Sequence, residues 1–307
     1  MSEPHTIDDR NSTAYRLRQA LVGKEFKVLD HGYVKLIDFL GDDATIVEAA
    51  RMSTDGGFVS WDPYDKHPDG DMGLLDFMKR KHHDSPFEMC EAVFEVQAPI
   101  MVYREWHRSR TQSYSEFSAR YSVMPNLHYV PSPERLKALA SSNKQAGSLN
   151  EHLGAEADFD TMIDAIASEQ NGIYGNYEQL LKDGVPKEIA RVNTPVSRYS
   201  RMRAKTDLRN WLGFLNLRKR PNAQFEIREF ADVVGNILSQ LFPRTWGLFE
   251  EYDLYSVSFS RTEMEVLRMA LASSVDVMAA IRNAGLSGRK KDELIEKLQK
   301  GGREILS

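Results

Sequence analysis

The sequence predicts an α+β fold in which a β-sheet is packed by helices within a single domain, and three observations lead to this class. Residues 87–98 alternate between apolar and polar side chains, which is the pattern of a half-buried strand. Residues 208–215 and 230–242 repeat apolar side chains at helical spacing. The chain shows neither an internal repeat nor a linker between domains.

The first elements expected are a β-hairpin and a short helix. Short alternating apolar stretches flank a turn at Asp30-His31-Gly32, so we expect two strands between Phe26 and Leu40. Gly41-Asp42-Asp43 supplies an N-cap for a helix over residues 44–52. Residues 1–25 are expected to form a loose N-terminal extension.

A long loop and a second helix precede the strand over 87–98. Residues 54–73 are rich in Gly, Asp and Pro and predict the loop. Leu74 begins a helix that ends near His82-His83. After the strand, Pro99 is expected at the first position of a helix that reaches Trp106.

Two polar segments show no helical period. Residues 109–122 are rich in Ser, Thr and Arg, so we expect an extended or looped chain there. Residues 131–172 are rich in Ser, Asn and Lys, and we expect an insertion or a mobile excursion.

The following residues are predicted to be mainly helical. Pro186 begins a short helical turn that Thr194-Pro195 ends, because the residue before a proline is pushed out of the helical region. Asp207 is a good N-cap for the helix over 208–215. The helix over 230–242 stops before Pro243.

Residues 261–307 are expected to form a C-terminal helical extension to a domain that spans residues 26–260. Residues 263–283 are amphipathic, with Gly285 as a stop. Residues 291–300 predict a final charged helix.

Composition restricts the class of protein. A formal net charge of −5 argues against a general nucleic-acid or anionic-membrane coat, which needs a basic surface. One cysteine excludes an intrachain disulfide framework and a Cys-cluster metal site. The sequence contains no run of eighteen apolar residues, so it predicts no membrane span. Its polar N-terminus lacks the features of a signal or transit peptide. We expect a cytoplasmic protein.

The positive charge is concentrated in two segments. Residues 187–220 hold ten basic and two acidic side chains, and residues 100–121 hold four basic and two acidic ones. These segments therefore carry +8 and +2, which leaves −15 for the rest. Clustered guanidinium groups suit a small multiply charged anion such as a phosphate. Solvated faces and ion pairs with the acidic remainder are the alternative interpretation.

Residues 108–121 combine hydroxyl groups, arginines and one glutamate with little to bury. Glu116, Ser118 and Arg120 are spaced at i, i+2 and i+4, so in an extended chain they face the same way. An acceptor, a hydroxyl and a cation side by side suit the polar edge of a sugar or base next to a phosphate. An ordinary polar loop is the alternative.

Several common signatures are missing. The sequence contains no Gly-x-Gly-x-x-Gly after a strand, no Walker loop, no His-Glu-x-x-His and no Gly-x-Ser-x-Gly. His82-His83-Asp84 are interpreted as capping or exposed residues rather than metal ligands. Cys90 lies on the apolar face of the predicted strand, which favours a small core residue over a nucleophile.

A series of motifs resembles the flavin-dependent thymidylate synthases. Arg108-Ser109-Arg110, seven residues and then Ser118 are similar to the family signature Arg-His-Arg-x7-Ser. The agreement extends in order over about residues 26–252, through Gly41-Asp42-Asp43, Ala50-Arg51-Met52-Ser53, Ser85-Pro86-Phe87-Glu88, Ala98-Pro99-Ile100, Glu188-Ile189-Ala190-Arg191, Phe214-Leu215-Asn216-Leu217-Arg218 and Asn222-Ala223-Gln224-Phe225-Glu226-Ile227.

The resemblance implies a non-Rossmann α+β fold that binds FAD, in a homotetramer with active sites at subunit interfaces. It implies reductive methylation of the uracil C5 of dUMP. Methylenetetrahydrofolate would supply the carbon, and flavin reduced by NADPH would supply the hydride. It implies no metal, nucleic-acid or membrane partner.

The resemblance also implies two sets of site residues. The nucleotide set is Glu105, Arg108, Glu116, Ser118, Ala119, Arg120, Arg191 and Arg218. The flavin set is Ser53, Ser85, Glu88, Arg108, Ser109, Arg110, Glu116, Asp207, Arg209, Gly213 and Asn222.

Arg218 is the catalytic residue that the resemblance implies, next to the uracil N3 and O4. A permanent cation at this place favours an enolate-like uracil and makes C5 more nucleophilic. No thiolate is then needed, whereas the conventional thymidylate synthases require a cysteine, and the single cysteine here is predicted to be buried.

The chain departs from the family pattern at a few positions. Ser109 stands for the central histidine of the signature, with His107 two residues earlier, and Glu105 stands for a usual glutamine. Asp207 and Gly213 replace asparagines that are common around the flavin. These differences leave open a relative that methylates UMP as well as dUMP, like the pyrimidine methylases of polyoxin-type nucleoside-antibiotic pathways. A uracil-nucleotide hydroxymethylase and a catalytically silent nucleotide- or RNA-binding relative are the alternatives.

Overall fold

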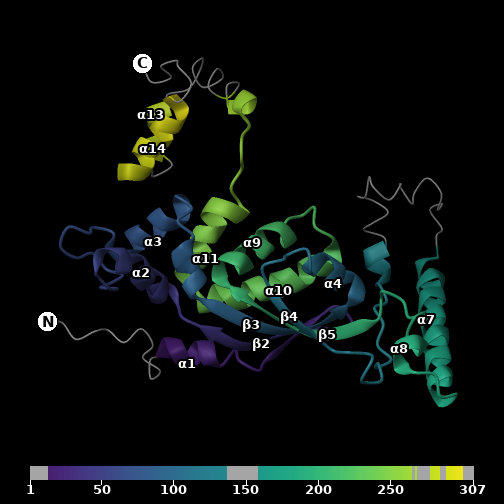
Figure 1. Ribbon diagram of the computed structural model, residues 1–307. Helices are drawn as coiled ribbons and strands as arrows, with labels where there is room; N and C mark the ends of the chain where they lie inside the picture. The colour runs from purple at the N-terminus through teal and green to yellow at the C-terminus, as the bar shows by residue number, and fades with distance from the viewer. Residues whose placement is uncertain (1–12, 137–157, 265–266, 268–276, 284–287, 300–307) are drawn as a thin grey trace. The chain divides into compact units, whose positions relative to one another are not determined.

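A five-stranded antiparallel sheet organises the larger part of the chain (Figure 1). Its order is β1-β2-β3-β5-β4, so the third strand is central and the fourth lies at an edge. The strands are β1 (Glu25–Val28), β2 (Gly32–Leu40), β3 (Glu91–Pro99), β4 (Ser113–Glu116) and β5 (Tyr199–Asp207). The sheet with its surrounding helices confirms the α+β class.

The computed structural model describes residues 13–136, 158–264, 267, 277–283 and 288–299. The chain divides into two compact units, Met1–Leu254 and Tyr255–Ser307. Among the described helices, none combines the length and the apolar character that crossing a bilayer would require.

The predicted hairpin and the predicted central strand are both confirmed. β1 and β2 pair around the expected turn, with Val28 opposite Gly32. β3 alternates between buried and partly exposed side chains as the sequence indicated, but it begins at Glu91. Residues 85–89 form a short 3-10 helix, η2 (Ser85–Met89), with Pro86 in its first turn. The chain therefore turns once before it enters the sheet.

β5 is a strand that the sequence analysis did not predict. It pairs with β3 along its whole length, from Glu91 opposite Asp207 to Pro99 opposite Tyr199. Its even-numbered residues are buried and its arginines and lysine are exposed, which is a clean two-residue alternation. Three of its buried residues, Ser200, Ala204 and Thr206, are small or polar, so the sequence there lacks the apolar alternation that predicts a strand.

Four helices lie where the sequence placed them. They are α2 (Asp43–Arg51), α3 (Gly70–Arg80), α9 (Leu208–Arg218) and α10 (Phe225–Leu241). Asp42 caps α2 by accepting from the backbone of Ala44 and Thr45, and Asp207 caps α9 by accepting from Asn210. α3 and α10 begin about one turn earlier than expected, so the predicted loop over 54–73 ends at Asp69.

The shorter helices differ from expectation in their ends. Pro99 closes β3 and is the N-cap of α4 (Ile100–Trp106), not its first helical residue. α8 (Lys187–Ala190) ends before Thr194, because the chain turns out of the helix at Arg191. Pro243 does stop α10, but it also starts α11 (Pro243–Phe249), which continues into the π-helix η3 (Glu250–Leu254).

Three further segments complete the comparison with the prediction. A short 3-10 helix, η1 (Met52–Thr54), extends α2. The expected loose N-terminal extension contains a helix, α1 (Thr13–Gln19). At the C-terminus, α13 (Val277–Asn283) and α14 (Gly288–Gln299) match parts of the two predicted helices, while residues 268–276, Gly285 and Lys300 lie outside the described residues.

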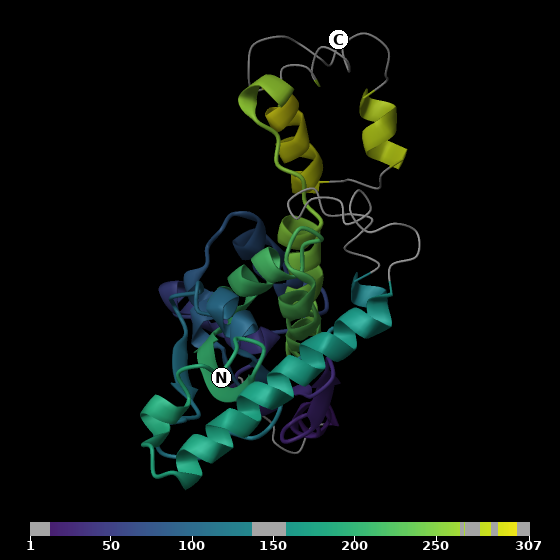
Figure 2. The same ribbon diagram turned by 90° about the vertical axis from the view of Figure 1, so that its right-hand side faces the viewer.

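The helix α7 (Phe159–Lys182) includes the last part of residues 131–172, where the sequence predicted an insertion or a mobile excursion and no helix. Its first turns carry Phe159, Met162, Ile163 and Ile166, which is the spacing of an amphipathic helix. Figure 2 shows α7 as a long helix beside the sheet domain. Residues 137–157 of the predicted excursion lie outside the described residues.

The main core lies between the sheet and the helices that cover one of its faces, α4, α9 and α10 (Figure 1). Aromatic rings join both β3 and α4 to α9, with Phe94 5.0 Å from Trp211 and Trp106 4.6 Å from Phe214, measured between ring centroids. These contacts fix α4 against α9 and so determine where the side chains at their C-terminal ends lie.

Candidate active site

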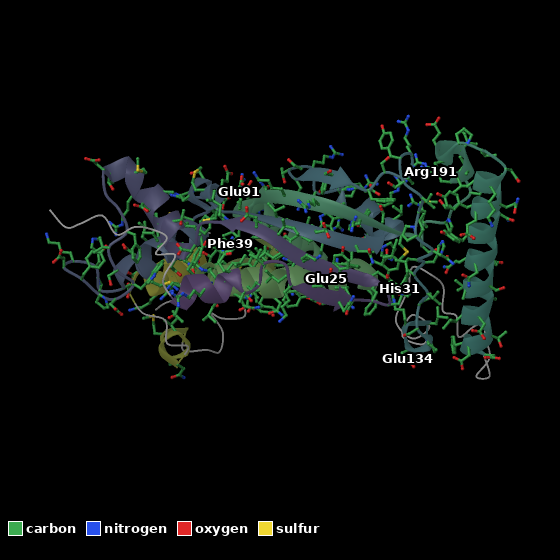
Figure 3. The ribbon with its side chains drawn as sticks, turned by 90° about the horizontal axis from the view of Figure 1, so that it is seen from below. Glu25, His31, Phe39, Glu91, Glu134 and Arg191 are labelled. Atoms are coloured by element: carbon green, nitrogen blue, oxygen red, sulfur yellow. The ribbon has the colours of Figure 1, made fainter. Side chains whose placement is uncertain are left out.

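A cleft of about 330 Å³ opens at the end of the sheet where β3 ends and β5 begins. Its polar lining includes Arg104, His107, Glu116, Ser118, Arg191 and Arg198. In Figure 3, Arg191 lies beside α7, away from Glu91, which marks the opposite end of β3. Three members of the nucleotide set, Glu116, Ser118 and Arg191, are thus brought together in one cleft.

Charge in this cleft is unbalanced. Its lining holds three arginines and one glutamate, so it carries +2 when His107 is neutral. Among the described residues, no acidic side chain forms an ion pair with Arg104, Arg191 or Arg198. The lining therefore favours an anionic ligand.

The predicted alignment of Glu116, Ser118 and Arg120 along one strand face is wrong. β4 ends at Glu116, and the chain turns at Ser118, where the Ser118 hydroxyl accepts from the Arg120 backbone at 3.3 Å. Arg120 instead lies 3.1 Å from Glu188, and both side chains are about half exposed. Glu116 accepts from the Ser200 hydroxyl at 2.7 Å. Glu116 and Ser118 therefore line the cleft, whereas Arg120 does not.

Ala119 belongs to a second, smaller core instead of a polar surface. It is buried with Met124, Tyr177 and Ala190, which links the turn after β4 to α7 and α8. Its side chain is therefore not available to a ligand. α7, which the sequence analysis missed, therefore supports the turn after β4.

Arg218 and Glu105 meet where the C-terminal ends of α4 and α9 approach each other. The Arg218 guanidinium donates to the Glu105 backbone carbonyl at 2.8 Å and lies 3.6 Å from the Glu105 carboxylate. Its Nε is buried and has no hydrogen-bond partner among the described residues. Burial raises the pKa of the Glu105 carboxyl, and the Arg218 charge partly opposes that rise. The Arg218 guanidinium is thus fixed in position, and its Nε–H is still available as a donor.

Four members of the flavin set gather at the other end of the sheet. Asp207 ends β5 and caps α9, while Ser85 and Glu88 lie on η2, which packs against α9. Arg209 lies 2.6 Å from Glu88 and 3.5 Å from Asp84. Hydrogen bonding to Glu88 raises the pKa of Arg209. Asp84, from the His82-His83-Asp84 run, is therefore part of an ion pair.

Most of the remaining residues of the flavin set are exposed. Ser53 follows α2 in η1, and its hydroxyl donates to the Ala50 carbonyl at 3.0 Å. Gly213 and Asn222 are exposed, and nothing lies within 4 Å of a Cβ placed on Gly213. Arg108 and Arg110 are also exposed, and the intervening Ser109 carbonyl accepts from the Tyr114 hydroxyl at 2.8 Å.

Comparisons with known proteins agree with this geometry. The family model described as thymidylate synthase complementing protein matches residues 35–244. Flavin-dependent thymidylate synthases from Wolbachia pipientis wMel and from a strain of Thermus thermophilus are each 39% identical to this chain, over 81% and 88% of it and 84% and 94% of their own lengths.

The chain belongs to the flavin-dependent thymidylate synthase family. It is accordingly an enzyme of the methyltransferase class. Among solved structures, the UMP/dUMP methylase PolB from Streptomyces cacaoi bound with 5-Br dUMP is similar, with a TM-score of 0.62 and 31% identity over 76% of this chain and 100% of that one. Both the predicted family and the likeness to its UMP/dUMP methylase branch are confirmed.

Three lining residues of the cleft were not among the predicted site residues: Arg104, His107, which the sequence analysis noted only for its position before Ser109, and Arg198. The first and last were counted in the two basic segments. Their convergence depends on α4 and on the unpredicted β5, so charge counting did not distinguish them from paired arginines such as Arg203, 3.6 Å from Glu95.

Cys90 is a core residue, as predicted. Its side chain is fully buried, and burial raises the pKa of its thiol far above the usual range. Its Sγ lies 3.5 Å from the Asp42 carbonyl. A thiol in this position is neither accessible nor ionised, so it offers no nucleophile to a substrate.

Proposed function

We propose that this member of the flavin-dependent thymidylate synthase family methylates C5 of a uracil nucleoside monophosphate, dUMP or UMP. Methylenetetrahydrofolate would supply the carbon, and flavin reduced by NADPH would supply the hydride. The observation that carries the proposal is the unpaired positive cleft that combines Glu116, Ser118 and Arg191 at the positions of the family motifs. The similar PolB is described as a UMP/dUMP methylase, which supports both sugars as candidates.

Within this proposal, Arg218 activates the uracil ring. Its guanidinium is fixed by the end of α4 through the Glu105 carbonyl, and its Nε has no partner among the described residues. A fixed cation beside N3 and O4 stabilises the negative charge that develops on these atoms when C5 attacks an electrophile. The orientation is set by the folded chain before the substrate arrives, so little reorganisation is needed.

Glu116 and Ser118 would orient the sugar and base. Glu116 is already held by the Ser200 hydroxyl, which fixes one carboxylate oxygen and leaves the other available as an acceptor. Ser118 lies in the turn that α7 supports. Since the lining also contains the cations that suit a phosphate, the cleft provides for each polar part of a nucleotide.

The residues of the flavin set fit an FAD cofactor. Exposed arginines at 108 and 110 can donate to phosphate oxygens, and the open space at Gly213 leaves room for a ligand against α9. Ser53, Ser85 and Asn222 add uncharged polar groups at the surface. A bound reduced flavin would supply the hydride, while the chain's own residues would bind and orient it.

We also propose a homotetramer whose active sites combine residues from different subunits. On one chain, Asp207 and Tyr199 lie at opposite ends of β5, about 26 Å apart at the usual rise of about 3.3 Å per residue. Asp207, Ser85, Glu88 and Arg209 of the flavin set lie at one of these ends, and the cleft lies at the other. A second copy that supplies one set to the other would bring them together. A cytoplasmic location, with no nucleic-acid or membrane partner, is part of the same proposal and is supported by the acidic composition.

A competition assay tests the reaction. The protein is supplied with FAD, NADPH, methylenetetrahydrofolate and an equal mixture of UMP and dUMP, and products are identified by mass. We expect a C5-methylated nucleotide whose formation depends on each of the three additions. A hydroxymethylated product would contradict the reductive step, and purification without flavin that FAD fails to reconstitute would contradict the cofactor.

A further inference from the structure

Arg198 is a cation in the cleft that none of the family motifs includes. It lies one residue before β5 and lines the same cleft as Glu116, Ser118 and Arg191. Unlike the exposed Arg104, Arg198 is partly buried. The residue therefore belongs to the wall of the cleft and not to its open rim.

The backbone around Arg198 is fixed by its neighbours in the fold. Its carbonyl accepts from the amide of Ile100, the first residue of α4, at 3.0 Å. Its own amide donates to the Pro195 carbonyl at 3.2 Å, and it forms an isolated β-bridge with His128. The guanidinium thus extends from a position set by α4, the turn after α8 and the segment before α7. Such anchoring preorganises a side chain for a ligand.

The charge of Arg198 is not balanced by the chain. Burial lowers its pKa, the nearby Glu116 carboxylate opposes this, and the like charge of Arg191 adds to it. Glu116 is the single acid in the lining and already accepts from Ser200. A partly buried cation next to a second cation is unfavourable unless a counter-ion is present.

We propose that Arg198 binds the 5′-phosphate of the nucleotide together with Arg191. This inference rests on the proposed function and names the phosphate contact within that site. A phosphomonoester carries a charge of about −1.5 to −2 at pH 7, which matches the +2 of the lining. Two guanidinium groups present paired donors to its oxygens. Glu116 and Ser118 then remain free for the sugar and base.

The test compares one variant on two ligands that differ only in the phosphate. Affinities of Arg198→Gln and of the wild type are measured for dUMP by calorimetry and for deoxyuridine by competition. We expect the affinity for dUMP to fall about 10- to 100-fold, the range for loss of a charged hydrogen bond, and the affinity for deoxyuridine to stay within about twofold. Arg203→Gln is the matched control, since Arg203 lies on the same region of chain but is exposed and paired with Glu95.

The remaining outcomes separate this inference from the proposed function. Unchanged dUMP affinity in Arg198→Gln, or an equal loss for both ligands, would overturn the phosphate assignment while the wild type still binds dUMP. A wild type that binds neither dUMP nor UMP would overturn the proposed function itself. Where thermal melting shows that the glutamine variant is unstable, Arg198→Met keeps an apolar stem in the wall of the cleft and removes the charge, and the same difference between ligands is expected.

Discussion

Arg218 combines two properties that usually conflict: its guanidinium charge is largely buried, and one of its N–H donors is still available. The largely buried guanidinium uses one nitrogen on the Glu105 carbonyl and keeps its Nε without a partner in the described chain. We expect Arg218→Gln to lower kcat by about 100- to 1000-fold, the size of losing one fixed charge-stabilising donor. dUMP affinity should change much less, because the phosphate contacts lie elsewhere. Single-turnover methylation measures the change in the rate of the chemical step, and calorimetry measures the change in dUMP affinity. A parallel loss of kcat and affinity would place Arg218 in binding and not in activation.

The carboxyl of Glu105 gives the same site a pH dependence. Burial raises its pKa above the usual value for a glutamate, against the pull of Arg218. Below that pKa the neutral acid leaves Arg218 its full charge, and above it the carboxylate 3.6 Å away offsets part of that charge. We therefore expect kcat to fall as pH rises through the pKa of Glu105, and Glu105→Gln to lack this decline and to be more active than the wild type above that pKa. A decline that persists in Glu105→Gln would assign the titration to another group.

At the scale of elements, the sequence predicted those helices whose ends and core face are determined by neighbouring residues in the chain. Asp42 and Asp207 were recognisable as N-caps, and the apolar spacing of α9 and α10 identified a core face. β5 and α7 were missed, because β5 buries small or polar residues and a polar flank precedes α7. The cleft depends on these two elements, since β5 positions Arg198 and α7 supports Ser118. The family motifs, and not the patterns, singled out Arg191, which the structure brings into one cleft with Glu116 and Ser118.

The packing of α7 is itself testable through Tyr177. This fully buried ring contacts the cluster that contains Ala119, and its hydroxyl accepts from the Met124 amide at 3.2 Å. We expect Tyr177→Ala to cost about 3 kcal/mol locally, as for other large-to-small core changes, and to raise KM for the nucleotide at least severalfold with a smaller effect on kcat. Tyr177→Phe, which keeps the ring, should retain a near-normal KM. Steady-state kinetics with denaturant unfolding checks both variants, and an unchanged KM in Tyr177→Ala would show that the turn does not depend on α7.

At the scale of the whole molecule, charge separates according to function. The surplus of positive charge lies in the segments that build the cleft and part of the flavin set, while Arg203 and Lys205 on β5 pair with Glu95 and Glu91. The ion-pair interpretation of the basic segments therefore holds for residues on β5, and the anion-site interpretation stays a proposal for the cleft. Paired cations contribute little to recognition, whereas the unpaired ones in the cleft define an anion site.

The proposed sharing of active sites between subunits predicts complementation between two inactive variants. Arg191→Gln removes a cation from the cleft, and Arg209→Gln removes an arginine of the flavin set at the opposite end of the sheet. If one chain supplies the first residue and a neighbour supplies the second, oligomers that contain both variants should regain about a quarter of wild-type activity after random mixing, because about one site in four receives two intact residues. Coexpression with distinguishable tags, followed by purification of mixed oligomers and an assay per active site, measures the recovery. Mixed oligomers that are as inactive as either parent would mean that each chain builds its site alone, since no chain in the mixture then has both arginines.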